Sequence, residues 1–183
     1  MTLELDQLRR CMACSGSRAA KYLTPINETL ERFDINTPTR IAAFLAQIGH
    51  ETMGLAYSRE IWGPTSQQLR YDPPSNLAQR LGNTKIGDGR KYMGRGLIQT
   101  TGRANYKQMS DVLGEDFIGK PELLEQPTYA ALSAGVFWDT RGCNALADAG
   151  RFEKLTRTIN GGINGLEDRM RRWSICREVL GEQ

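Results

Sequence analysis

Apolar residues recur every three or four positions in the first part of the chain, which is the spacing of one helix face. One such stripe consists of Ala19, Tyr22, Leu23, Ile26, Leu30 and Phe33. A second consists of Ile41, Phe44, Leu45 and Ile48. Thr37 is a suitable N-cap for the second stripe, because Pro38 then takes the first helical position. Both stripes predict helices that bury one face.

The remainder of the chain also reads as helical, with one irregular stretch. Apolar spacing predicts helices over residues 103–113, 127–139, 143–149, 151–159 and 165–180. Prolines predict a loop with a short helix over 63–76, followed by one or two helical turns over 76–81. Six glycines in 82–102 favour a small β-hairpin or irregular loops over a helix. The predicted fold class is therefore mainly α, with little strand.

Two glutamates near the end of the second stripe are candidates for acid–base chemistry. Glu51 follows Ile48 by three positions and falls on the same apolar face, where a carboxyl loses solvent. Glu60 comes nine positions later, and Gly54 favours an end to the helix between them. A bend there would bring the two together, and paired carboxylates about 6.5–9.5 Å apart suit an inverting glycoside hydrolase. The alternative is that both are ordinary solvated glutamates.

The most specific segment runs from Gly94 to Tyr106. Gly94 and Gly96 permit a close backbone approach, and the side chains of Gln99, Thr100 and Thr101 offer partners for sugar hydroxyls and a water. Asn105 could act in the same way from the start of the next helix. A polar hairpin leading into a helix, without a ligand, explains the same pattern equally well.

Three other features are less specific. Asn160 lies in a glycine-rich turn, and His50, the one histidine of the chain, is more typical of a hydrogen-bonded structural residue than of a metal ligand. The run Arg169-Met170-Arg171-Arg172-Trp173 is basic. Such runs are usually solvated faces, and weak contact with anionic membrane or lipopolysaccharide is the minor alternative.

The chain length and the net charge limit the number of domains and the kinds of partner to expect. A chain of 183 residues suits one domain, 1–183, with 1–36 as an N-terminal helical extension and about 63–102 as a small loop or β-hairpin lobe. A net charge of +3 is too weak to argue for nucleic acid. We expect a monomer without a secretory signal, in which reduced thiols are favoured over a zinc site at Cys11, Cys14, Cys143 and Cys176.

Several short motifs together resemble glycoside hydrolase family 19, the family of plant-type chitinases and many phage lysozymes. They are His50-Glu51-Thr52, Gly94-Arg95-Gly96-x-Ile98-Gln99, Asn105-Tyr106 and Ile159-Asn160-Gly161-Gly162, in the family's order. The resemblance implies a lysozyme-like fold of two helical lobes around a cleft. It further implies an inverting mechanism with Glu51 as acid, Glu60 as base and Thr101 holding the water. The substrate-binding positions that it implies are His50, Gln99, Asn105, Tyr106, Asn160 and Arg169.

The chain differs from the plant enzymes in being short and in lacking their disulfide framework, which places it nearer the phage endolysins. We therefore predict a muramidase-type endolysin that needs no cofactor and cleaves peptidoglycan glycan strands. It would be made in the host cytoplasm and act in the periplasm and cell wall after a holin-type pore opens. A chitinase, a lytic transglycosylase and a non-catalytic sugar-binding protein remain the alternatives.

Overall fold

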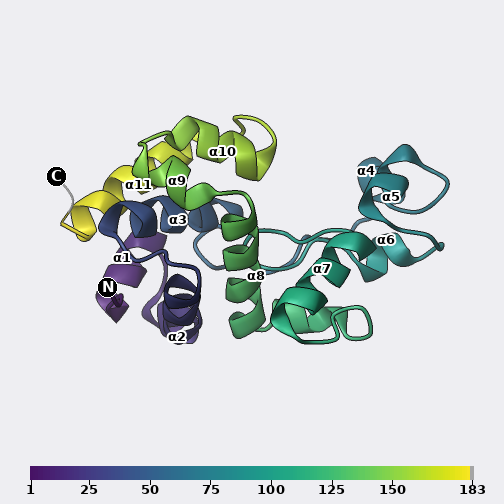
Figure 1. Cartoon of the computed structure of the whole chain (residues 1–183), viewed down its shortest axis with the longest axis horizontal. Coiled ribbons are helices and arrows are strands. Elements are labelled where there is room, and N and C mark those ends of the chain that lie inside the picture. The colour runs from purple at the N-terminus through teal and green to yellow at the C-terminus, as the bar shows by residue number, and fades with distance from the viewer. Residues whose placement is uncertain (182–183) are drawn as a thin grey trace.

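The computed structural model describes residues 1–181, and the part of the chain so described is mainly helical (Figure 1). Its helices are α1 (Leu5–Met12), α2 (Gly16–Arg32), α3 (Pro38–Glu51), α4 (Ser66–Leu69), α5 (Asn76–Leu81), α6 (Asp88–Lys91), α7 (Arg103–Leu113), the 3₁₀ helix η1 (Pro121–Glu125), α8 (Pro127–Thr140), α9 (Cys143–Asp148), α10 (Phe152–Asn160) and α11 (Leu166–Val179). The mainly α prediction is confirmed, and the helices expected after residue 103 agree to within one residue at each end.

The glycine-rich stretch is mostly irregular, which is one of the two forms expected for it, and it differs from the prediction in containing a short helix. In place of a regular hairpin it contributes to two isolated bridges, Arg59 with Arg95 and Arg95 with Thr100. It also contains α6, where no helix was expected. The reason is tertiary, because the Asp72 carboxylate, from outside this stretch, accepts hydrogen bonds from the backbone N–H groups of Gly87 and Gly89 at 3.1 and 2.7 Å.

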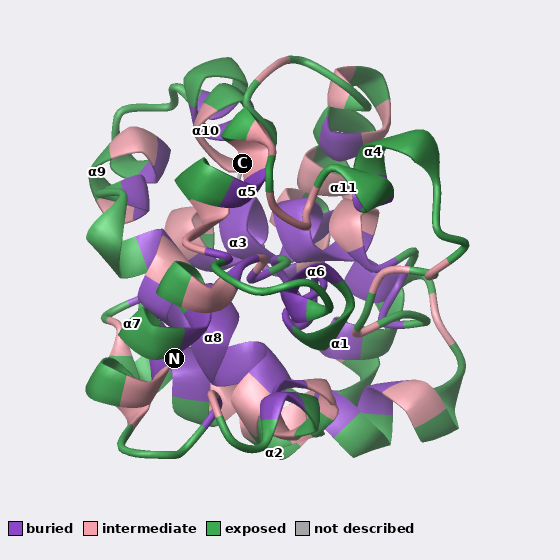
Figure 2. Cartoon of the chain, turned by 90° about the vertical axis from the view of Figure 1, so that its right-hand side faces the viewer, coloured by how far each residue is buried: buried purple, intermediate pink, exposed green. Residues whose placement is uncertain are grey.

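The larger lobe is built around α3. Every residue from Ile41 to Gly49 is buried, so this helix is enclosed on all sides, as a helix at the centre of a core should be. Helices α1, α2, α8, α9, α10 and α11 surround it and share its hydrophobic cluster (Figures 1 and 2). The C-terminal end of α3 thus projects from a rigid core and carries Glu51 on its last turn.

The N-terminal helices belong to this core. Leu8, Met12, Ile26 and Leu30 are each at most 1% exposed and lie in the same cluster as α3. Residues 1–36, expected as an extension, therefore supply part of the packing around α3. Cys11 on α1 lies against Cys176 on α11, and its carbonyl oxygen is 3.9 Å from the Cys176 sulfur. All four cysteines are free thiols.

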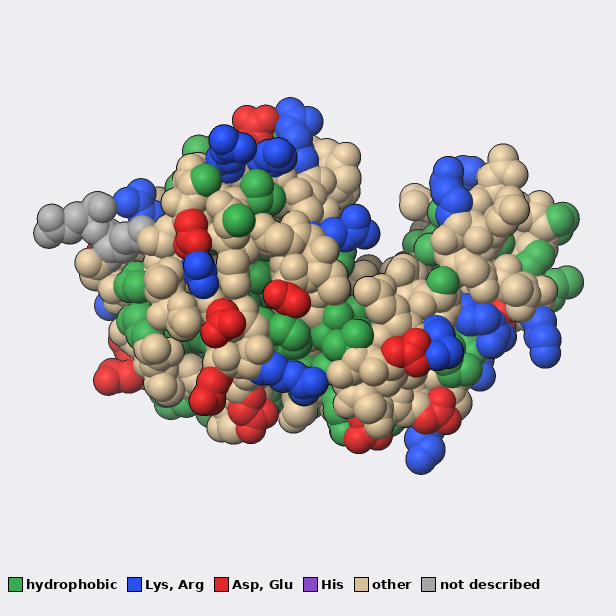
Figure 3. Space-filling view, viewed as in Figure 1, with side chains coloured by type: hydrophobic (Ala, Val, Ile, Leu, Met, Phe, Trp, Pro, Cys, Tyr) green, Lys and Arg blue, Asp and Glu red, His purple; other side chains and the backbone are tan. Residues whose placement is uncertain are grey.

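A second hydrophobic cluster holds the smaller lobe. Its buried members are Tyr92, Tyr106, Met109, Phe117, Leu124 and Val136. The small lobe expected over residues 63–102 is thus joined by α7 and η1, while α8 lies between the two parts of the molecule (Figure 1). The surface is hollowed between them, with basic side chains on both sides of the hollow (Figure 3). Within residues 1–181, no helix has the length and apolar character needed to cross a membrane.

Candidate active site

Glu51 is placed by the way in which α3 ends. The Thr52 hydroxyl donates to the Ile48 carbonyl at 2.6 Å and accepts from the Leu55 N–H at 2.8 Å, which closes the helix. Met53, Gly54 and Leu55 then all have positive φ, so the chain reverses direction. The bend expected after Glu51 is present, and at Gly54 a Cβ would lie 2.5 Å from the Met12 carbonyl oxygen.

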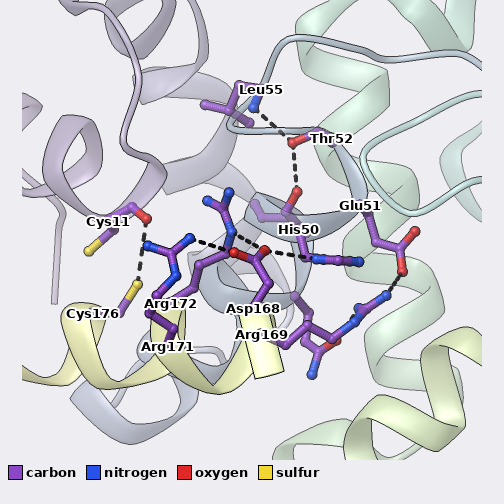
Figure 4. Close-up of polar contacts among 12 residues, drawn as sticks. Cys11, His50, Glu51, Thr52, Leu55, Asp168, Arg169, Arg171, Arg172 and Cys176 are labelled. Carbon is purple, nitrogen blue, oxygen red and sulfur yellow. Dashed lines mark hydrogen bonds and ion pairs between the residues drawn. The ribbon is translucent and has the colours of Figure 1, made fainter. Parts of the chain in front are cut away.

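The Glu51 carboxylate forms an ion pair with a buried arginine. Arg169 on α11 is fully buried, and its Nη2 lies 2.5 Å from Glu51 Oε1 (Figure 4). Its Nη1 donates to Gln47, whose side-chain amide in turn donates to Thr156 at 2.9 Å. Glu51 itself keeps 22% of its side chain exposed, so its burial is only partial. A fixed cation beside a reachable carboxylate stabilises the ionised carboxylate, which is the form that remains once a proton has been given up.

His50 belongs to a second network beside the first. Its Nδ1 lies 2.8 Å from Asp168 Oδ2, and Arg171 and Arg172 donate to the same carboxylate (Figure 4). Burial raises the pKa of Asp168, but the hydrogen bonds from Arg172, His50 and Arg171 outweigh it and hold that pKa well below its usual range. The network ties the end of α3 to the start of α11.

Glu60 lies on an irregular segment and is fixed mainly by the backbone. Its Oε1 accepts the Gly94 N–H at 2.6 Å, and its Oε2 accepts from the Gln68 amide at 3.0 Å. Its own N–H donates to the Gly94 carbonyl at 2.9 Å. Each carboxylate oxygen has two lone-pair directions, so both can still accept a proton from a water. Gln68 is a site-forming residue that the sequence analysis missed.

Gly94 is the point on which the predicted polar side chains converge. A Cβ at this position would lie 2.5 Å from Gln99 Oε1 and 3.1 Å from Thr101 Oγ1, so only glycine leaves room for both. Thr101 is half-buried and Gln99 exposed. Because the Gly94 N–H also binds Glu60, the structure brings Gln99, Thr101 and Glu60 to one short piece of backbone.

Arg95 and Glu125 hold this piece of backbone in place. Arg95 is 7% exposed, and its Nε donates to Glu125 at 2.7 Å while its Nη1 donates to the Tyr106 hydroxyl at 2.9 Å. Neither residue was expected at the site. Their pairing could not be found from spacing, because Arg95 and Glu125 lie 30 positions apart.

Two hollows open near these residues. One, of about 460 Å³, is lined by Glu60 together with Tyr57, Trp62, Arg59 and Arg90, among others. A volume of this size is within the range of small-ligand sites. The other hollow, of about 280 Å³, is lined by Gln99 and Asn105 and by residues of α7 and α8.

Two residues of the predicted substrate-binding set, Tyr106 and Arg169, are buried. Tyr106 is 0% exposed, and its hydroxyl donates to the Met93 carbonyl at 2.6 Å, so it is a core residue, and burial raises its pKa. Arg169 is also 0% exposed and reaches Glu51, so its place is behind the carboxylate. Asn105 and Asn160 are exposed, and the Asn105 amide donates to the Thr101 carbonyl at 2.7 Å.

The arginines of the basic run on α11 mostly make contacts within the protein. Arg169 points into the core, and only 14% of the Arg172 side chain is exposed. Trp173 stacks on Phe152 with ring centroids 4.4 Å apart. Arg171 is exposed, but its guanidinium pairs with Asp168. The three arginines and Trp173 of this run therefore contact other residues of the protein.

A family model matches most of this architecture. Residues 19–149, which include both glutamates and the Gly94 segment, match the model described as "Chitinase class I" of the Glyco_hydro_19 family. The chain belongs to glycoside hydrolase family 19. The expected family is therefore confirmed, and with it the assignment of the chain as a glycoside hydrolase.

Curated relatives and solved structures agree with this membership. A Haemophilus influenzae protein described as "Glycosyl hydrolase family 19 domain-containing protein" is 36% identical over 168 residues, which cover 79% of this chain and 82% of that protein. Endochitinase 2 of Gossypium hirsutum is 38% identical, over 77% of this chain but only 57% of the plant protein. The chain thus spans little more than half of that plant relative.

The fold is also that of solved family members. Chitinase C from Streptomyces griseus superposes with a TM-score of 0.74 and 23% identity, over 97% of this chain and 76% of that one. A bacterial family 19 chitinase superposes with a TM-score of 0.75 and 23% identity, over 100% of this chain and 97% of that one. The lysozyme-like helical fold predicted from the motifs is confirmed.

Proposed function

We propose that this family 19 enzyme is an endolysin that hydrolyses glycosidic bonds in the glycan strands of bacterial peptidoglycan. The observation that carries the proposal is the pair of fixed carboxylates. Glu51 is paired with a buried arginine, and Glu60 is held by two donors at the wall of a cavity. Such a pair is what acid–base hydrolysis of an acetal requires.

In the proposed mechanism Glu51 is the general acid. Its carboxyl proton passes to the glycosidic oxygen as the bond between that oxygen and the anomeric carbon breaks. The leaving sugar departs as an alcohol, and Glu51 is left as a carboxylate. Arg169, at 2.5 Å, then stabilises the new negative charge without any movement of the chain.

Glu60 is the general base of the same step. It accepts a proton from a water while the oxygen of that water bonds to the anomeric carbon on the face opposite the leaving group. The product therefore has the inverted configuration. Gly94 and Gln68 hold the carboxylate in one orientation, and Thr101 beside Gly94 would hold the water. No cofactor takes part in this scheme.

Peptidoglycan is favoured as the substrate by charge. The cavity beside Glu60 has two arginines in its lining, and the whole chain carries a net charge of +3. Cell-wall glycan is anionic, whereas chitin is neutral, so a basic site suits the wall polymer better. Chitin is the second candidate, and it is supported by the cotton relative, which is described as an endochitinase.

Digestion of purified sacculi, followed by mass spectrometry of the fragments, tests the proposal. We expect muramic acid at the new reducing ends and the mass of one added water per cleavage. Turnover of chitin oligomers should be slower than turnover of sacculi. Fragments ending in 1,6-anhydro sugar would instead identify a lytic transglycosylase. Absence of any cleavage product would identify a non-catalytic sugar-binding protein, and normal lysis by Glu51→Gln would remove Glu51 from the mechanism.

In this role the enzyme would act as a monomer, made in the host cytoplasm and released to the wall through a pore formed by a separate protein. Expression in a bacterial cytoplasm tests this step. Lysis should follow only when a pore-forming protein is expressed with it. Lysis that proceeds equally well without the pore would contradict this route.

A further inference from the structure

Arg90 differs from the other arginine of the cavity lining in having no hydrogen-bond or ion-pair partner among residues 1–181. It lies on α6 and lines the same 460 Å³ cavity as Glu60. Arg59, the other arginine of the lining, is 3.5 Å from the Glu125 carboxylate. For Arg90, whose side chain is exposed, no hydrogen bond or ion pair is found with any residue from 1 to 181. An arginine with all its donors free beside a catalytic carboxylate is available to a ligand.

The backbone that carries Arg90 is firmly held. The Asp88 carboxylate, 4% exposed, accepts from the Thr84 and Lys85 N–H groups at 2.9 and 3.1 Å and pairs with Arg103 at 2.7 Å. The Asp72 carboxylate accepts from the Gly89 N–H at 2.7 Å, immediately before Arg90 in the chain. These contacts fix the short helix at the cavity wall, so the backbone from which the Arg90 side chain extends has a defined place.

The rest of the lining shows what kind of ligand would meet this guanidinium. Tyr57 and Trp62 supply ring faces of the kind on which sugar rings pack, and Trp62 is supported by Tyr71 at a ring distance of 6.2 Å. Glu60 supplies the polar end. A sugar seated there would present its ring substituents to Arg90. Arginine binds carboxylates through two parallel hydrogen bonds, a geometry that neutral acetamido and hydroxyl groups do not offer.

We propose that Arg90 binds a carboxylate carried by the glycan strand and so makes the enzyme prefer anionic over neutral glycans. The inference rests on the proposed function, since it assigns a specificity residue to the same site. Two parts of peptidoglycan carry this group. One is the lactyl ether of muramic acid where the peptide has been removed, and the other is the peptide stem itself.

The test compares Arg90→Gln with wild type on matched substrates. The substrates are glycan stripped of peptide and peptide-bearing glycan. Each is used in its acid form and again after its carboxylates have been converted to methyl esters. The control is Arg80→Gln, which makes the same charge change at an exposed α5 residue outside the cavity. The quantity measured is the ratio of kcat/KM on the acid form to kcat/KM on the ester form.

We expect Arg90→Gln to lower this ratio about tenfold, in line with the loss of one charge-assisted hydrogen-bonded pair. The loss should appear mainly in KM, and Arg90→Lys should restore part of it. Arg80→Gln should give the wild-type ratio. A fall seen on stripped glycan assigns the lactyl carboxylate, and a fall confined to peptide-bearing glycan assigns the stem. An unchanged ratio on both substrates overturns the inference.

A binding measurement separates this failure from failure of the proposed function. In a Glu51→Gln background, calorimetry with a soluble muramyl disaccharide-peptide should show weaker binding when Arg90→Gln is added, and no such difference for its methyl ester. If wild type cleaves sacculi but this difference is absent, only the Arg90 inference is wrong. If wild type cleaves chitin oligomers and leaves sacculi intact, the proposed function is wrong as well.

Discussion

The two glutamates of this enzyme are held in opposite ways. Glu51 ends a helix whose residues 41–49 are all buried, and it is fixed by side chains, through a buried chain of contacts from Arg169 to Gln47 and Thr156. Glu60 lies on irregular backbone and is fixed by the main chain of a distant segment, with Gly94 both donating to it and accepting from it. The proposed acid, Glu51, is thus anchored in the core, whereas the position of the proposed base, Glu60, depends on how two loops meet.

This difference predicts which changes affect folding and which affect only chemistry. Removing a buried partner of Glu51 leaves charges without compensation inside the protein, which is costly. Changing the Glu60 side chain alters a group at a cavity wall, and the backbone contact between Glu60 N–H and the Gly94 carbonyl remains. Four predictions test this contrast.

The largest effect on activity is expected from Glu60→Gln. Loss of the base should lower kcat by about 10²–10⁴-fold, because no other carboxylate lines the cavity to take the proton from water. The folded structure should persist, as judged by thermal unfolding. Glu122→Gln, an exposed change on η1, is the matched control and should keep wild-type kcat. Equal activity of the two variants would remove Glu60 from the mechanism.

Arg169→Met is expected to act on stability as well as on activity. The change removes the guanidinium to which both Glu51 and Gln47 are hydrogen-bonded. It should cost about 3–5 kcal/mol of unfolding free energy, as when one partner of a buried pair is removed. Arg171→Met, on the same helix but exposed, should cost at most about 1 kcal/mol. Urea unfolding of the two variants measures the difference. Similar losses of unfolding free energy in the two variants would show that the buried contacts of Glu51 do not anchor it more firmly than Glu60 is anchored.

Gly96→Ala should destabilise the Glu60 side more than Gly94→Ala does. Gly96 has φ of +100°, and a Cβ there would meet Ser133 Oγ at 2.5 Å, so we expect a cost of about 1–3 kcal/mol. At Gly94 the new Cβ meets the end of the exposed Gln99 side chain, which can turn away. Gly94→Ala should therefore lower kcat/KM with little change in Tm. Thermal unfolding and steady-state kinetics of both variants give the comparison.

The smallest effect concerns acid stability through Asp168. Its pKa is depressed in the folded protein, so its stabilisation is present above the unfolded pKa of about 3.9 and is lost as the pH falls further. Asp168→Asn should lower Tm by a few degrees near neutrality and shrink the further fall in Tm below about pH 4. Asp139→Asn, at an exposed position, is the control. An unchanged acid dependence in Asp168→Asn would mean that the network around His50 does not contribute.

The helices of this fold were predictable because burial leaves a periodic trace in the sequence. The apolar stripe through Phe44 and Ile48 placed Glu51 on the correct face and at the correct end of α3. For α7 the predicted and observed bounds are the same. Gln47 was a further signal that went unused, since a polar residue within an apolar stripe is a candidate partner for a buried charge.

The remainder could not be predicted because it depends on contacts between distant segments. Gly94 and Glu60 are 34 positions apart, and no local pattern reports their hydrogen bond. In the run from Arg169 to Arg172, composition does not show which guanidinium turns inward. Tyr106 was assigned to the substrate from its place in a motif, although its hydroxyl is used by Met93 and Arg95. A motif marks a position without showing which side of it faces the ligand.

Helix α8 has a consequence for the molecule as a whole. Its residues Ala130, Ala134 and Trp138 belong to one hydrophobic cluster and Val136 to the other. Neither half could be excised with its interior intact, since each would lose one wall. The enzyme should therefore unfold as a single cooperative unit. The cavity beside Glu60 would then be lost only when the whole chain unfolds.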